Sequence, residues 1–426
     1  MRRMTIMAIG VAFWLGTGLP GAAARADEGL PGPANGTVLT QSEAVRLVLD
    51  RSRELRVLAG EESAQEREVE AAATSFHDPQ LRLEDLSTRY ADPDANKQIT
   101  VGLRWQPPRL GELPAAEQKE RVLLWAKKVT ARALRARLAA QARKEYAEQA
   151  LLRDSRRLSA ARVGLEERRL AAVEALVALG QRPLLDRVRS MRRLVKARRD
   201  DARLRQRLAD GAERLSGLTG VAGDVELSLG APPELDLDFP AVHRVAVEHR
   251  PEVGLAEQRS RLADREYSAE RLRLMPWFSF LEVGYVHETE KPDWGEFRIG
   301  IDLPFSRWNL SHLRAAATAR QANAHAGAGA VEAVDRDVAQ ALARYREALA
   351  ALRELRADDG NLQATTRDLL AAVRRDPTLA ADDVVDLELA ELDERQMALD
   401  ARYDLEAAAA DLCVAAGVER WEDLLP

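Results

Sequence analysis

The chain has 426 residues, of which 31% are charged and 5% are aromatic, and its formal net charge is −6. A sequence so rich in charge is not a bundle of membrane-spanning helices; its Ala, Leu, Glu and Arg content is typical of long packed helices. Cys413 is the only cysteine, which excludes an intrachain disulfide and a thiolate metal cluster. We expect it to be buried in a helix.

The first residues have the three parts of a secretory signal. Arg2 and Arg3 are followed by an apolar stretch at 6–19 and by small residues at 22–26, which predicts a signal peptide over residues 1–26. Residues 27–38 are rich in Gly and Pro and predict a flexible lead. No later stretch has the roughly 18 apolar residues of a membrane helix.

Two short helices are predicted next. Thr40 and Glu43 form a capping box, so a helix begins there and runs to about Asp50. A second helix is predicted from Glu54 to about Thr74. The alternating residues that follow predict two strands, at about 80–90 and 98–106, joined by the polar segment 91–97. Ile99, Val101, Leu103 and Trp105 share one face of the second strand, and Thr100, Gly102, Arg104 and Gln106 share the other.

A long helix is then predicted over 113–179. At 1.5 Å per residue it would be about 100 Å long. The segment Ala178 to Leu184 contains Gly and Pro and predicts a sharp turn. A returning helix at 184–215 completes a first unit, 39–217, and a strand-capable linker follows at 218–239.

The same order of parts returns in a second unit, 240–418. Strands are predicted at about 278–288 and 296–305, a long helix at 310–375 and a returning helix at 382–415, with a tail at 419–426. Tyr146 and Tyr345 occupy equivalent positions in the two long helices. We therefore predict an internal two-fold repeat. The seam of the second long helix alternates steps of three and four, a heptad stripe: Val331, Val334, Val338, Ala341, Tyr345, Ala348, Leu352 and Leu355.

The strands are long enough to cross a bilayer on a tilt, and a single hairpin cannot close its own edges. Aromatic residues near the strand ends are candidates for the membrane interface: Trp105, Trp277, Trp294 and Trp308. Trp294 could equally anchor a loop.

The returning helices carry opposite charge. Residues 184–215 include eleven basic and five acidic residues, a net +6, whereas 382–411 include eleven acidic and two basic, a net −9. For most of these charges the favoured interpretation is a solvated surface. We also hypothesise that the two fields attract each other around an opening and help to keep it closed. The candidate gate residues are Asp186, Arg192, Arg193, Asp382, Asp383 and Asp386.

Together these parts resemble the outer-membrane efflux protein family, the TolC-like channels. The likeness covers about 39–418 and rests on Leu39–Thr40 with Glu43, on Phe76 to Leu81, on Val101 to Pro107 and on Ile299 to Phe305, each of the last two followed by a long helix. The resemblance implies a mainly α chain with a small β part. Three chains would each give two hairpins to one transmembrane barrel of twelve strands, and the coiled-coil helical hairpins would form a periplasmic α-barrel.

The resemblance also implies a function: a passive exit duct in the outer membrane, extending into the periplasm, for a tripartite efflux or type I secretion system. Its partners would be a periplasmic adaptor (membrane fusion) protein, an inner-membrane pump and outer-membrane lipid, without nucleic acid. Adaptor docking would fall on the helical turns: Leu179, Gly180, Pro183, Leu184, Pro377 and Leu379.

The alternative is a periplasmic coiled-coil adaptor or structural scaffold, which also uses long helical hairpins. An exported hydrolase is least favoured, because no nucleophile–base grouping is visible, so we expect no enzymatic activity. The six histidines lack metal-ligand spacing, and no cofactor or metal is expected.

Overall fold

A computed structural model describes most of the chain. Its described residues are 38–74, 78–84, 98–221, 226–230, 234–288, 292–303, 305, 310–373 and 381–424. The predicted signal peptide, Trp308, Pro377 and Leu379 lie outside them, as do the side chains of Asp382 and Asp383.

The described elements follow one another in the same order in both halves. The first half comprises β1 (Val38–Thr40), α1 (Gln41–Arg51), α2 (Arg53–Thr74), β2 (Gln80–Glu84), β3 (Gln98–Trp105), α3 (Glu112–Ala178) and α4 (Leu184–Thr219). The second comprises β4 (Glu226–Ser228), α5 (Phe239–His249), α6 (Pro251–Leu272), β5 (Trp277–Glu288), β6 (Trp294–Asp302), α7 (Ser311–Val373), α8 (Ala381–Ala416) and a 3-10 turn, η3 (Glu422–Leu424). The expected mainly α chain with few strands is confirmed.

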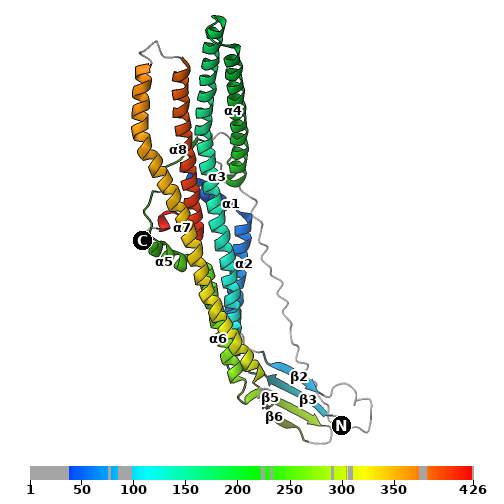
Figure 1. The fold of residues 1–426 in the computed structure, drawn as a ribbon. Helices are drawn as coiled ribbons and strands as arrows, with labels where there is room; N and C mark the ends of the chain where they lie inside the picture. Colours follow the sequence, from blue (N-terminus) through cyan, green and yellow to red (C-terminus); the bar gives the residue numbers. More distant parts are fainter. Residues whose placement is uncertain are drawn as a thin grey trace, which may run out of the picture.

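Two long helices set the shape of the molecule. α3 has 67 residues and α7 has 63, so each spans on the order of 100 Å. α4 and α8 pair with them at one end, and α2 and α6 lie beside them toward the other, where the sheet is (Figure 1). The short helices thus cover the half that the returning helices do not reach.

Helix seams supply the apolar core. The heptad stripe of α7 is buried at Val334, Val338, Ala341, Tyr345 and Leu352, where it meets α5 and α8. Cys413 lies in the same cluster, and its burial raises the pKa of the thiol to about 11. The predicted heptad seam and the buried cysteine are both confirmed.

Two tyrosines make equivalent contacts in the two halves. Tyr146 on α3 and Tyr345 on α7 are both 0% exposed. The Tyr146 hydroxyl donates to the carbonyl of Leu39, just before α1. The Tyr345 hydroxyl donates to the carbonyl of Leu235 at 3.1 Å and accepts from its N–H at 2.9 Å, just before α5. Each long helix therefore anchors the segment that begins its half.

The predicted capping box at α1 is present. The Glu43 amide donates to Thr40 Oγ1 at 3.3 Å, and the Thr40 amide donates to Glu43 Oε2 at 2.9 Å. The Thr40 hydroxyl also donates to Glu43 Oε2 at 2.9 Å, and the hydrogen bonds that the Thr40 amide and hydroxyl donate to this carboxylate lower the pKa of Glu43 below its ordinary value of 4.5. A lowered carboxyl pKa adds stability above that value, and the added stability is lost as the pH falls through the folded-state pKa.

We expect Thr40→Ala to destabilise the first turn of α1 by about 1 kcal/mol, roughly a fivefold increase in the opening of its amides. Glu43→Ala should open the same turn at pH 7, and its difference from the wild type should shrink below pH 4.5. Hydrogen exchange, corrected for intrinsic rates, measures both. A Glu43→Ala effect that stays constant down to acid pH would contradict the assignment.

Within the described parts of the chain, none of the helices combines the length and the apolarity that crossing a membrane requires.

Candidate functional site

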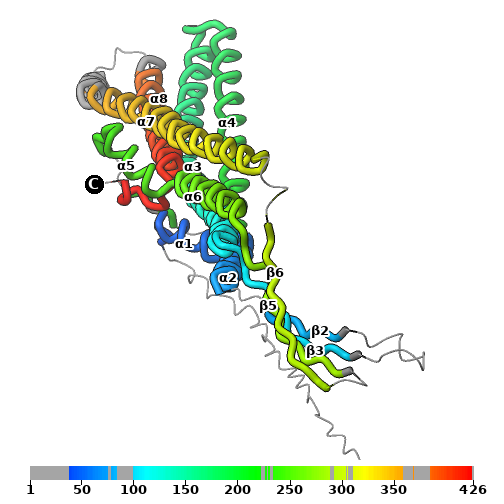
Figure 2. The backbone as a smooth tube through the Cα atoms, turned by 90° about the horizontal axis from the view of Figure 1, so that it is seen from below, coloured from blue at the N-terminus to red at the C-terminus, as the bar shows by residue number. Residues whose placement is uncertain are grey.

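The strands of both halves come together in one four-stranded sheet of order β2-β3-β5-β6. β3 pairs antiparallel with β5, from Gln98↔Glu288 to Trp105↔Leu281, so hairpins almost two hundred residues apart in sequence are adjacent. The strands project as a group beyond the helices (Figure 2). β2 and β6 are the edge strands, and each presents an open row of backbone groups that can pair with a further strand.

One face of the sheet is apolar and uncovered. The register aligns Leu81, Leu103, Val283 and Phe297 in one row across all strands. Eleven apolar side chains of this face are 36–68% exposed: Leu81, Leu83, Val101, Leu103, Phe278, Leu281, Val283, Tyr285, Phe297, Ile299 and Ile301. So large a contiguous apolar surface marks contact with lipid or another protein.

The other face carries the charged side chains of the sheet, and its centre is buried. Thr100 and Glu282 are each 3% exposed, and Gly102 lies directly opposite Gly284. Glu282 Oε2 accepts from Arg82 at 3.1 Å, and its Oε1 lies 3.8 Å from Arg298. Arg298 also pairs with Glu296. One buried carboxylate therefore joins arginines of β2 and β6, a link across 200 residues of sequence that alternation alone could not reveal.

Three of the predicted interface tryptophans are described. All stand at strand ends, as expected: Trp105 ends β3, Trp277 begins β5 and Trp294 begins β6. Trp105 lies opposite Leu281 on the apolar face. The register instead places Trp277 opposite Asp302 and Trp294 opposite Val286, on the polar face. A belt around the outside of the sheet can therefore include Trp105 but not the other two.

Helices α2, α3, α4, α6, α7 and α8 form an elongated shaft (Figure 1). Its end far from the sheet includes the predicted turn between α3 and α4. Gly180 has φ +68°, a conformation that favours glycine and ends α3. Its amide donates to Val177 O at 3.0 Å, and that of Gln181 to Leu176 O at 2.9 Å. Leu179 and Leu184 are both exposed, and Pro183 caps α4. Of the predicted docking residues, these four lie together at one tip.

α4 also shows an apolar stripe without a partner in the chain. The helix buries Ser190, Leu194 and Ala197, and its extensive contact is with α3. On another side it exposes an apolar series with steps of four, three and four residues: Leu184, Val188, Met191 and Val195. Heptad spacing of this kind is typical of a helix–helix seam.

The charged side chains of α4 and of α8 form ion pairs with α3. On one side, α3 carboxylates pair with α4: Glu174–Arg187 at 2.9 Å, Glu167–Arg198 at 2.7 Å, Glu148–Arg207 at 3.4 Å and Glu145–Arg214 at 2.9 Å. On the other, α3 bases pair with α8: Lys144–Asp411 at 2.6 Å, Arg162–Asp393, Arg168–Glu388 at 3.3 Å and Arg169–Asp386. Among the described residues, α3 lies between the two oppositely charged helices and complements both (Figure 1).

The candidate gate residues are therefore in different surroundings. Asp386 pairs with Arg169, which is 2% exposed and also lies 3.6 Å from Glu166. Asp186 pairs with Arg189 one turn along α4 at 3.4 Å. Arg192 and Arg193 are exposed on α4, and no ion pair of theirs occurs among the described residues. The sequence did not indicate Arg169, because nothing local distinguishes it from the many other arginines of α3.

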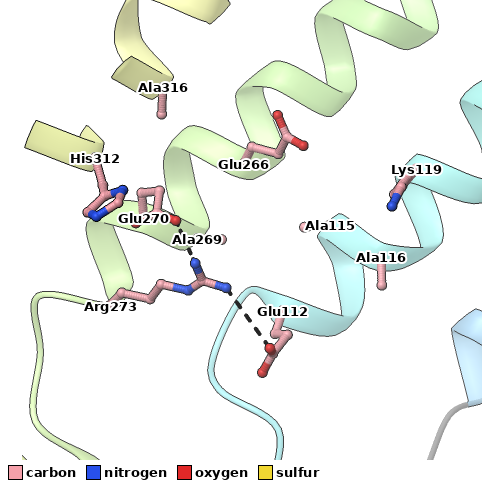
Figure 3. Close-up of a pocket in the computed structure, with 10 residues that line it drawn as sticks. All are labelled: Glu112, Ala115, Ala116, Lys119, Glu266, Ala269, Glu270, Arg273, His312 and Ala316. Atoms are coloured by element: carbon pink, nitrogen blue, oxygen red, sulfur yellow. Dashed lines mark hydrogen bonds and ion pairs between the residues drawn. The ribbon is translucent and has the colours of Figure 1, made fainter. Parts of the chain in front are cut away.

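A cavity of about 380 Å³ is lined by residues of α3, α6 and α7 and by Arg273 just beyond α6 (Figure 3). Arg273 lies across it, pairing with Glu270 at 2.6 Å and lying 4.0 Å from Glu112 of α3. His312 and Lys119 line other sides. No group of three metal-ligating side chains occurs in the part of the chain described. The approach of Arg273, just beyond α6, to Glu112 of α3 links the two halves of the chain near the sheet.

The sequence matches no protein-family model and no curated protein. Solved structures do match. CusC, described in terms of transmembrane channel formation, aligns with TM-score 0.69 and 18% identity over 89% of this chain and 92% of its own. The Neisseria gonorrhoeae MtrE outer membrane channel, in its open state, aligns with TM-score 0.67 and 18% identity over 89% of each chain.

This chain has the TolC-like outer-membrane channel fold. The outer membrane protein VceC from Vibrio cholerae aligns as well, with TM-score 0.66 and 14% identity over 89% of this chain and 96% of its own. The resemblance predicted from the order of sequence parts is thus confirmed for the fold. The TolC-like fold explains why the helical shaft and the amphipathic sheet occur in one chain.

Proposed function

We propose that this chain is the outer-membrane component of a tripartite efflux or type I secretion system, a passive, non-enzymatic exit duct. The amphipathic sheet with two open edges is the observation that carries the proposal. Its apolar face suits lipid, and its polar face suits a water-filled interior. Lipid does not tolerate unpaired strand edges, so the edges must be closed by further strands.

A second copy of the chain supplies those strands. β2 of one copy can pair with β6 of the next, and this head-to-tail arrangement closes into a ring. Three copies of a four-stranded sheet would give twelve strands. The exposed apolar stripe of α4 supports the same arrangement, because a neighbouring copy would cover it. The equivalent element order and the two tyrosine anchors support an origin of both halves in one duplicated unit, as proposed from the sequence.

The remaining roles follow from the position of the shaft. With the sheet in the outer membrane, the helices extend into the periplasm, and their tips face an adaptor and an inner-membrane pump. Leu179, Gly180, Pro183 and Leu184 are the proposed docking residues, with Pro377 and Leu379 on the other turn. The gate proposal is retained for Arg192 and Arg193, which would act toward a neighbouring copy, and for Asp186, Asp382, Asp383 and Asp386.

Membrane fractionation and heating-sensitive migration test this function. The mature protein should partition with outer membranes, migrate as a trimer before boiling, and form ion-conducting pores in planar bilayers. A periplasmic adaptor or scaffold would give a different result: a monomer in aqueous buffer without detergent, with the sheet open to protease. That result would overturn the channel.

A further inference from the structure

The polar face of the sheet contains an aromatic ring that simple alternation would not put there. The pairing of β5 with β6 shifts between Phe278 and Phe280, so that Ser279 is an extra residue, a β-bulge. Phe278 lies opposite Ile301 on the apolar face, whereas Phe280 lies opposite Gly300 on the polar face. A Cβ at Gly300 would overlap the Phe280 ring. The ring therefore lies over the bare backbone of β6.

A guanidinium group from another strand covers that ring. Cζ of Arg104, on β3, lies 3.8 Å from the centroid of Phe280, which is a cation–π contact. Arg104 Nε is buried and has no hydrogen-bond partner among the described atoms. A ring in this position restricts how the guanidinium can turn, and therefore where its N–H donors can point.

The neighbouring carboxylates are already occupied. Glu282 stands directly opposite Arg104 in the register, but its oxygens serve Arg82 and Arg298. Glu296 pairs with Arg298. Three guanidinium groups thus face two carboxylates in the middle of the sheet, and among the described residues Arg104 is the one with no carboxylate partner.

We propose that Arg104 and Phe280 form a binding contact for planar aromatic anions, carboxylates or sulfonates, as they leave through the duct. This inference rests on the proposed function, which turns the polar face toward the lumen. A guanidinium offers a planar fork of donors that matches a carboxylate or sulfonate, and the face of the guanidinium turned away from Phe280 can stack on the flat aromatic part of the same molecule. A ring of three chains would carry three such contacts.

The contact acts locally, because the face as a whole is not basic. In the strand register Glu84 lies opposite Thr100 and Glu288 lies opposite Gln98, so acidic as well as basic residues occupy the strands that carry this face. Bulk ion selectivity therefore reports the sum of these charges. Block of the pore by a molecule that fits the contact reports Arg104 and Phe280 alone.

The experiment measures block of single-channel KCl current by naphthalene-2-sulfonate in planar bilayers. Arg104→Gln should raise the half-blocking concentration about tenfold, the effect of losing a charged hydrogen bond. Arg104→Lys, which keeps the charge but loses the flat fork, and Phe280→Leu should each raise it about threefold. Neutral 2-naphthol should block weakly and equally in all variants.

Arg109→Gln is the matched control. Its guanidinium lies just beyond β3 and is already paired with Asp302 at 2.5 Å, so block should remain as in the wild type. Equal block in the wild type, Arg104→Gln and Arg104→Lys overturns the contact while leaving the channel intact. Absence of any conductance from the wild type overturns the proposed function and this inference with it.

Discussion

Leu81→Lys is expected to prevent assembly of the protein in the outer membrane. Leu81 is 68% exposed on the apolar face of β2, and a lysine facing lipid costs about 2–4 kcal/mol at the bilayer midplane. A ring of three copies would bear that cost three times. The expected result is loss of the heating-sensitive trimer from outer-membrane fractions and accumulation of monomer, measured by fractionation and unboiled electrophoresis.

Gln80→Lys is the control for this prediction. It introduces the same side chain one residue earlier on the same strand, but on the polar face, opposite Arg104. The like charge costs about 0.2–1 kcal/mol, so assembly should be largely retained. If Leu81→Lys and Gln80→Lys assemble equally well, the apolar face does not meet lipid, and the channel proposal loses its main support.

Asp386→Asn is expected to loosen α8 from α3 near the tip. The change removes the negative charge that Asp386 of α8 presents to the buried guanidinium of Arg169, which also lies 3.6 Å from Glu166. Removing one partner of a fully buried pair costs about 3–5 kcal/mol. Asp386 is 62% exposed, and solvent screening reduces the expected loss to about 2 kcal/mol. Hydrogen exchange of the amides at 384–392 should be roughly thirtyfold faster, with little change in α5.

The neighbouring pair, Arg168 with Glu388, is the matched control. Arg168 is mostly exposed, and pairs at the surface contribute about 0–1 kcal/mol, so Arg168→Met should change the same amides far less. If the gate proposal holds, Asp386→Asn should also raise single-channel conductance. Comparable exchange rates in the two variants would show that the buried Arg169 pair stabilises the packing of α8 on α3 no more than the exposed Arg168 pair does.

Local patterns predicted the elements well because each depends on residues close together in sequence. The capping box at Thr40 and Glu43 spans three residues, and the alternation at Leu103 and Arg104 assigns adjacent residues to opposite faces. The heptad stripe of α7 repeats within two turns. In each case the physical cause is the fixed geometry of a helix or strand, which the sequence expresses directly.

Contacts between elements were harder to predict from the sequence. The alternation of residues along β5 did not reveal the bulge at Ser279. An extra residue can be recognised only when pairing with a second strand fixes the register. The opposite charge of α4 and α8 was visible in the sequence, but a count of charges does not show that α3 lies between the two helices. The polar-face ion pair of Arg82 and Glu282 depends on two hairpins meeting.

The sequence by itself thus determined the long helices, the two amphipathic hairpins and their repeated order, since periodicity and capping act over a few residues. Only the tertiary structure decided that the hairpins form one sheet, that α3 receives the charge of both returning helices, and that Arg104 lies on Phe280. Those outcomes depend on which distant elements become neighbours, and similar arginines along α3 and the strands are distinguished only by what packs against them.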